Sequence, residues 1–250
     1  MTNETNNNIK QETTKTSKRK YKKEMGKAKI QSDKKNHEKA IPTYTKYAEQ
    51  GKAKALTRLG YCHNMGNGVE KDEEKAVEYY IKAANQGYRV AQNNLADCYY
   101  HGQGVPQDYA KAIEWFTKSA KQGTRNSLKR LGDIYYYGYG VKKDHKKAFE
   151  YYLQAAQKKH IHAAYCVGYM YQYDKYIKQD YKKAFAWYTK AARAGNKYSY
   201  RELGNMYYNG YGVPKNLKKA AECYDKASRL LDYTSSEFIQ KYKLDKYLTK

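Results

Sequence analysis

The chain has 250 residues, enough for one large domain or two small ones with a sizeable core. Lys and Arg total 49 against 25 Asp and Glu, and the resulting net charge of +24 favours anionic partners such as nucleic acid or acidic proteins. No apolar run of about 18 residues could span a bilayer, and the four cysteines form no CxxC pair. We therefore expect a soluble cytoplasmic monomer with reduced thiols rather than a membrane-spanning or disulfide-bonded secreted protein.

The first 33 residues are polar and charged and nearly free of large apolar side chains, so they are predicted to form a disordered basic tail. Within this tail, SKRKYKK from Ser17 to Lys23 is typical of a nuclear-import signal or a nucleic-acid-binding patch. Short basic runs are also common in disordered tails, so nuclear localisation remains an alternative. A helix is expected next, over about residues 36–50, with a kink or a late start at Pro42.

A repeat organises residues 34–231. The dipeptide Lys-Ala recurs every 36 residues without an insertion, at positions 39/40, 75/76, 111/112, 147/148, 183/184 and 219/220. Five full segments follow this period, and in each one apolar and small residues recur at the spacing of one helical face in two successive stretches. Each segment is therefore predicted to be a helical hairpin.

Glycine and aspartate mark the ends of these helices. The first helix of a hairpin is expected to end at Gly66, Gly102, Gly138 or Gly210, since glycine tolerates the left-handed backbone of a helix end. The second is expected to begin after the N-caps Asp72, Asp108, Asp144, Asp180 and Asn216. The fourth segment has Asp174 and Tyr176 in place of the turn glycines, so its turn is predicted to be rebuilt.

The combined pattern LG..Y..G.GV..D..KA..YY.KAA.QG resembles the Sel-one-like repeat (SLR) family, relatives of the tetratricopeptide repeats. The resemblance implies an all-α fold: a right-handed α-solenoid of about five 36-residue helix-turn-helix repeats with flanking helices. It also implies a non-catalytic scaffold or adaptor that holds a protein or peptide segment in its concave groove. Residues 232–250 are predicted to form a C-terminal capping helix, which begins at a capping box from Thr234 to Glu237.

Phosphate-loop, metal and catalytic chemistry are not predicted. The Gly-x-Gly turn lacks the Gly-Lys-Ser/Thr of a P-loop, and the Asp cap of each following helix would repel a phosphate. His160 and His162 are two residues apart at a helix start and so point in different directions. No nucleophile, base and acid come together, so we expect no catalytic residue, metal ligand or cofactor.

Two surfaces are candidates for partner binding. Since the first helices of such solenoids usually line the concave face, their non-core positions are candidate contacts: Arg58, Tyr61, Asn93, Asn94, Asp97, Tyr100, Lys129, Arg130, Asp133, Tyr136, Tyr169, Arg201 and Asn205. The residues at these positions vary between segments, as expected if they recognise a non-repetitive ligand with Tyr and Arg as anchors. Unconstrained sequence variation at the surface predicts the same variability without a function.

The second surface is a lysine-rich ridge predicted to bind RNA or another polyanion: Lys142, Lys143, Lys146, Lys147, Lys178, Lys182, Lys183, Lys215, Lys218 and Lys219. Positive charge at a helix N-terminus opposes the helix dipole, so the ridge brings no obvious stability. A compositional bias toward lysine would produce the same ridge without a function.

Overall fold

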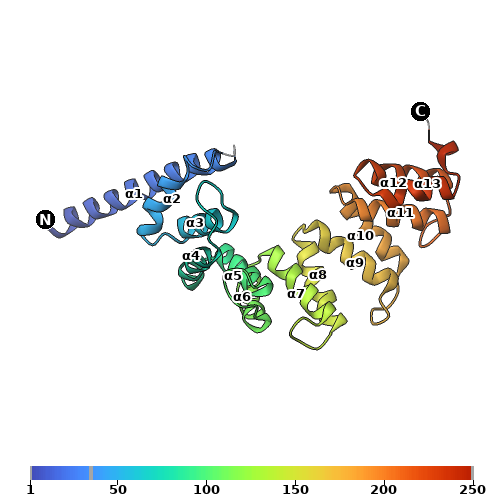
Figure 1. Ribbon diagram of the computed structural model, residues 1–250, viewed down its shortest axis with the longest axis horizontal. Coiled ribbons are helices and arrows are strands. Elements are labelled where there is room, and N and C mark those ends of the chain that lie inside the picture. Colours follow the sequence, from blue (N-terminus) through green and yellow to red (C-terminus); the bar gives the residue numbers. More distant parts are fainter. Residues whose placement is uncertain (1, 34–35, 249–250) are drawn as a thin grey trace. The chain divides into compact units, whose positions relative to one another are not determined.

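The computed structural model describes residues 2–33 and 36–248, and these are helical with no strand among them (Figure 1). The chain divides into two compact units, Met1–Gln122 and Gly123–Lys250. No helix of the described residues is long and apolar enough to cross a membrane.

Among the described residues of the first unit there are six helices, and they pack in chain order. They are α1 (Thr2–Asp33), α2 (Ile41–Glu49), α3 (Ala53–Met65), α4 (Glu73–Asn85), α5 (Arg89–His101) and α6 (Tyr109–Lys121). Alanine and tyrosine dominate the core of this unit: Ala76 and Ala83 are fully buried, and Tyr80 is almost so. Small side chains let the helices approach closely, and the tyrosine ring fills the space that remains between them.

The second unit continues the same arrangement. Its elements are α7 (Arg125–Tyr137), α8 (His145–Gln157), α9 (Ile161–Tyr173), α10 (Tyr181–Arg193), α11 (Lys197–Asn209), α12 (Leu217–Arg229), α13 (Tyr233–Lys241) and the 3-10 helix η1 (Asp245–Tyr247). Each helix from α7 to α13 packs against the next, and η1 packs against α12. Helical hairpins stacked in this way form the solenoid that the repeat predicts.

The predicted helix ends are confirmed. Gly66, Gly102, Gly138 and Gly210 adopt left-handed backbone angles at the ends of α3, α5, α7 and α11. Asp72, Asp108, Asp144, Asp180 and Asn216 each accept a hydrogen bond from the backbone N–H three residues later. The charged or polar cap satisfies a donor that the helix itself cannot pair.

A glycine within the first helix lies against the tyrosine of the second in four of the five repeats. These pairs are Gly60 with Tyr80, Gly132 with Tyr152, Gly168 with Tyr188, and Gly204 with Tyr224. A Cβ atom on Gly132 would stand 2.6 Å from ring carbon Cδ1 of Tyr152, well inside van der Waals contact. Glycine is therefore required here for close packing and not for an unusual backbone angle.

The turn of the fourth repeat is rebuilt as predicted. In the last repeat Gly212 comes so close to the start of α10 that a Cβ would lie 2.7 Å from the Tyr181 carbonyl carbon. Tyr176 stands at the position equivalent to Gly212, and its Cβ does not allow the backbone to come so close to the preceding helix. Asp174, at the position of the first turn glycine, has φ −77° and so is not left-handed. Instead the Asp174 carboxylate contacts Nδ1 of His145 at 2.5 Å, and the Tyr176 ring packs on His145.

The prediction of a disordered tail over residues 1–33 is wrong, because Thr2–Asp33 forms helix α1. Met25 and Ala28 are buried in the core of the first unit, and Tyr21 packs edge-on against Tyr47. Glu24 also accepts hydrogen bonds from Lys46 and Tyr47. A few apolar residues one helical turn apart are enough to dock a polar helix, although its overall composition is typical of disorder.

The flanking helices are shorter than expected. Helix α2 starts late, at Ile41, with Pro42 in its first turn. At the other end α13 stops at Lys241, and the chain continues through η1, so residues 232–248 are not one helix. The predicted capping box is also wrong, since Asp232 takes the N-cap position of α13 and accepts the Ser235 hydroxyl hydrogen bond. The last two residues lie outside the described part of the chain.

Candidate functional site

The candidate partner-binding residues lie on the first helices α3, α5, α7, α9 and α11, but their accessibility differs widely. Tyr61 and Tyr169 are exposed, at 42% and 37%. Asn93 and Asp133 are buried, at 8% each. The others are partly buried: Arg58, Asn94, Asp97, Tyr100, Lys129, Arg130, Tyr136, Arg201 and Asn205. Only some of the predicted set is therefore available to a partner.

Asp133 and Asn205 hold buried tyrosine hydroxyls. The Tyr152 hydroxyl donates to Oδ1 of Asp133 at 2.9 Å, and the Tyr224 hydroxyl donates to Oδ1 of Asn205 at 2.7 Å. Lys129 donates to the second oxygen of Asp133 at 2.6 Å. Asp133 and Asn205 therefore accept hydrogen bonds from tyrosine hydroxyls of the core. Sequence reasoning missed this structural role.

The acceptor and the ring have the same spacing in two of the five repeats. Each acceptor lies 19 residues before the tyrosine whose hydroxyl it accepts. In the second repeat the ring position is Phe116, which has no hydroxyl, and Asp97 instead accepts a hydrogen bond from Asn93. Ring and acceptor do not covary across the repeats, since Tyr61 and Tyr169 stand 19 residues before Tyr80 and Tyr188, so this spacing does not identify Asp133 as a core residue.

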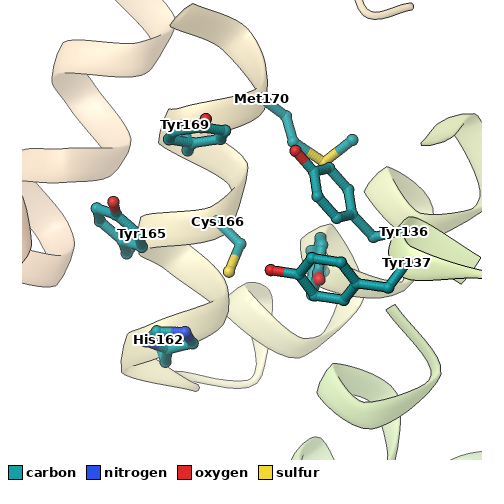
Figure 2. A pocket seen from close by; sticks show the side chains of 8 residues that line it. Tyr136, Tyr137, His162, Tyr165, Cys166, Tyr169 and Met170 are labelled. Carbon is teal, nitrogen blue, oxygen red and sulfur yellow. The ribbon is translucent and has the colours of Figure 1, made fainter. Parts of the chain in front are cut away.

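An aromatic pocket lies between α7 and α9 in the second unit (Figure 2). It encloses about 330 Å³, and its lining residues are Tyr136, Tyr137, Tyr152, His162, Tyr165, Cys166, Tyr169 and Met170. Tyr137 points from α7 toward Cys166 on α9 in Figure 2. The pocket brings together Tyr136 and Tyr169, two of the predicted contacts, and adds Tyr137 and Cys166, which the sequence did not single out as contacts.

The pocket is uncharged at neutral pH. Burial, and then the nearby Asp133 charge, raise the pKa of the Cys166 thiol to about 12, so it stays protonated. Burial likewise raises the pKa of Tyr136 to about 12. A thiol of this kind is a poor nucleophile. An uncharged pocket lined by aromatic rings suits an apolar or aromatic side chain.

The lysine-rich ridge is partly explained by packing. Lys147 lies over the Tyr135 ring, Lys183 over Tyr171, Lys215 over Tyr208 and Lys219 over Tyr207, at 4.0 to 5.5 Å from the ring centroids. Cation–π contacts of this kind give these lysines a structural reason to be present. The sequence alone had not provided that reason.

The other lysines of the ridge are exposed: Lys142, Lys143, Lys146, Lys178, Lys182 and Lys218. Lys142, Lys143 and Lys146 border a shallow hollow of about 680 Å³ beside His145. The basic segment from Ser17 to Lys23 lies within α1, and all of its side chains except the half-buried Tyr21 are exposed.

No group of three His, Cys, Asp or Glu that could hold a metal ion occurs in residues 14–33 and 36–248, whose side chains the structure describes. The four cysteines are free thiols, with Cys62 and Cys98 buried in the core. His160 caps α9 by accepting from the Ala163 N–H, and so has a structural role of its own.

Stacked helical hairpins with capped turns and an aromatic pocket between first helices define an α-solenoid of the tetratricopeptide-like class. The Sel1 repeat family model matches five consecutive segments, residues 53–88, 89–124, 126–160, 161–196 and 197–230. The chain therefore belongs to the Sel1 repeat family, whose members are generally scaffolds for protein interactions and typically non-catalytic. No curated protein sequence matches it.

Solved structures share the fold. A Sel1 repeat protein from Oxalobacter formigenes is 29% identical, with a TM-score of 0.79 over 84% of this chain and 86% of that one. The protective antigen c5321 of uropathogenic Escherichia coli is 30% identical, with a TM-score of 0.53 over 76% of this chain and 49% of that one. The immunity protein Pa5087 of Pseudomonas aeruginosa is 21% identical over 77% of this chain and 74% of that one, with a TM-score of 0.51, and shares the fold alone.

Proposed function

We propose that this protein is a non-catalytic scaffold that binds a protein or peptide segment along its first helices. The aromatic pocket between α7 and α9 carries this proposal, because it is uncharged and its tyrosine rings include the exposed Tyr137 and Tyr169. Tyrosine combines a large apolar ring with a hydroxyl and loses little conformational entropy on binding, so it is a frequent anchor in protein interfaces. The exposed Tyr61 on α3 is a comparable anchor in the first unit.

Affinity capture from cell lysate tests this proposal. The bait is the full chain, and the variants are Tyr61→Ala and Tyr169→Ala, which truncate the two exposed rings on first helices. Tyr233→Ala is the matched control, since Tyr233 is 75% exposed but lies at the start of α13. We expect a partner that the unaltered chain retains and that one of the first two variants loses while the control keeps it. Retention of every captured protein by all three variants would contradict the proposal.

Polyanion binding is the second candidate, and the hollow bordered by Lys142, Lys143 and Lys146 favours it. Three exposed ammonium groups around one hollow would neutralise phosphates of a nucleic acid, and binding of this kind weakens steeply with salt. An electrophoretic mobility shift with single-stranded RNA at several salt concentrations tests it. Binding that Lys142→Ala with Lys146→Ala weakens would support this candidate, and no shift at the lowest salt concentration would remove it.

A further inference from the structure

A basic hollow lies at the N-terminal ends of the first helices in the second unit. It encloses about 430 Å³, and its wall includes Arg125, Lys159 and Lys197 together with His160 and His162. No Asp or Glu is among the described residues that line it. Three cationic side chains without a carboxylate in the same wall leave a positive potential that an anionic group would neutralise.

Lys159 occupies a position that is glycine after four of the second helices, and Leu231 at the end of the last repeat is the other exception. Gly51, Gly87, Gly123 and Gly195 are the equivalent residues, and all have positive φ. Lys159 adopts the same left-handed backbone, with φ 62°, although a side chain is disfavoured there. The guanidinium of Arg125 donates to the Lys159 carbonyl at 3.1 Å and places a second cation beside it. The exception to the repeat therefore adds positive charge to the wall of the hollow.

The histidines of this hollow are held neutral. Burial, followed by the charge of Lys129, lowers the pKa of His160 to about 4. The same two causes, in the same order, lower the pKa of His162.

The basic hollow adjoins the aromatic pocket. His162 lines both of them, and Figure 2 shows it at the edge of the aromatic pocket. The His162 ring lies 5.7 Å from Tyr165 of the aromatic pocket, and Tyr165 lies 5.9 Å from Tyr198 of the basic hollow, measured between ring centroids. A single extended ligand can therefore contact both.

We propose that the aromatic pocket and the basic hollow form one site for an acidic peptide segment that carries an aromatic side chain. The ring of the peptide enters the pocket between Tyr137 and Tyr169, and its carboxylates lie in the hollow beside Lys159 and Arg125. This inference rests on the proposed function and adds the chemistry of the ligand to it. Single-stranded nucleic acid also uses aromatic rings beside basic side chains, and its competition with the peptide is one outcome of the test below.

Fluorescence anisotropy with a labelled synthetic peptide tests this site. The probe is a short peptide with one tryptophan flanked by glutamates, and two matched peptides replace the tryptophan by alanine or the glutamates by glutamine. The protein variants are Tyr137→Ala, which opens the pocket at a ring that is 53% exposed, and Lys159→Gly, which restores the repeat residue. Lys121→Ala, in the other unit, controls for the loss of one positive charge. Thermal melts verify that each variant is folded.

We expect Tyr137→Ala to weaken binding of the full peptide about tenfold and Lys159→Gly about threefold at low salt. Lys121→Ala should leave it unchanged. Tyr137→Ala should not affect the peptide without tryptophan, and Lys159→Gly should not affect the peptide without glutamate. Equal binding of all three peptides would overturn the inference, and so would binding of the full peptide that neither Tyr137→Ala nor Lys159→Gly weakens, or that only one of them weakens. Displacement of the peptide by single-stranded RNA at a lower concentration than by unlabelled peptide would also overturn it.

The peptide titration and the lysate capture together separate this inference from the proposed function. If the peptides do not bind as expected but capture of a protein from lysate depends on Tyr61 or Tyr169, the scaffold function stands and the proposed ligand chemistry is wrong. If no captured protein depends on those residues and the peptides also fail, both proposals fall.

Discussion

At the scale of single residues, the contact between Gly132 and Tyr152 shows how tightly each hairpin is packed. The Tyr152 ring cannot move away easily, because Asp133 holds its hydroxyl and the side chain is only 3% exposed. A methyl group at position 132 has to displace this ring or separate the two helices.

Gly132→Ala is therefore expected to lower the free energy of unfolding by about 1–2 kcal/mol, since overpacking outweighs the gain in helix propensity. Gly26→Ala is the control, because a Cβ at that helical position meets nothing within 4 Å. This control should be neutral or slightly stabilising. Urea denaturation measures both, and equal stability of Gly132→Ala and the unaltered chain would show that the close contact does not constrain the fold.

His160 makes the stability of the second unit depend on pH. Its Nδ1 accepts the Ala163 N–H bond that caps α9, so this nitrogen must be unprotonated. Burial lowers the pKa of His160 in the folded state to about 4, below its unfolded value of about 6.5. The unfolded chain therefore binds the extra proton more readily, and stability falls as pH drops from about 6.5 to about 4.

His160→Asn should flatten this part of the pH profile, because asparagine caps α11 in the same way at Asn196 and does not titrate. Urea denaturation of both proteins at a series of pH values between 4 and 7 measures the difference. A constant difference in stability across that range would mean that protonation of His160 is not linked to folding.

At this scale the sequence predicts helix caps well and surface contacts poorly. Asp144 and its equivalents were identified because a cap is a local feature of the chain. Asp133 and Asn205 were assigned to a binding surface because their hydroxyl partners lie on another helix. Tyr137 was missed because no periodic signal distinguishes a ring at a pocket from a ring in the core.

At the scale of elements, capping sets where the second helices begin. Asp144→Ala should lower the free energy of unfolding by about 1 kcal/mol, because the Lys147 N–H loses its acceptor. Asp144→Asn should retain most of the stability, since Asn216 already serves as the cap of α12. Chemical denaturation of the two variants distinguishes them, and equal losses would show that charge rather than the hydrogen bond matters at this position.

Helix α1 depends on a small apolar contact. Met25 is 1% exposed in the core of the first unit, whereas Ile30 on the same helix is 54% exposed. Met25→Ala should release the helix and speed proteolytic cleavage between residues 14 and 33, while Ile30→Ala should not. Limited trypsin digestion followed by mass spectrometry measures this. Similar cleavage rates in both variants would indicate that α1 is held by contacts other than Met25.

The sequence failed at α1 because the prediction rested on overall composition, which averages over the few residues that dock the helix. It succeeded for the repeats because period, turn and cap all agree there. The fourth repeat shows the limit of that agreement: the loss of glycine predicted a rebuilt turn, but not that Asp174 would contact His145.

At the scale of the whole molecule, the repeat specifies the class of fold but not the partner. Stacked hairpins contact mainly their neighbours, so the same architecture accepts many surface sequences. The features that distinguish this chain are departures from the repeat, such as Lys159 in place of glycine and the gathering of tyrosines on α7 and α9. Periodicity identifies such departures, whereas only the structure shows that they lie next to each other.

The central claim is that a partner binds to the first helices rather than to the second. Site-specific photo-cross-linking tests it most directly, with benzoylphenylalanine placed either at Tyr169 on α9 or at the exposed Glu150 on α8. After irradiation in lysate, we predict a cross-linked protein from position 169 that is absent from position 150. A cross-link from position 150 alone, or the same product from both positions, would contradict the account.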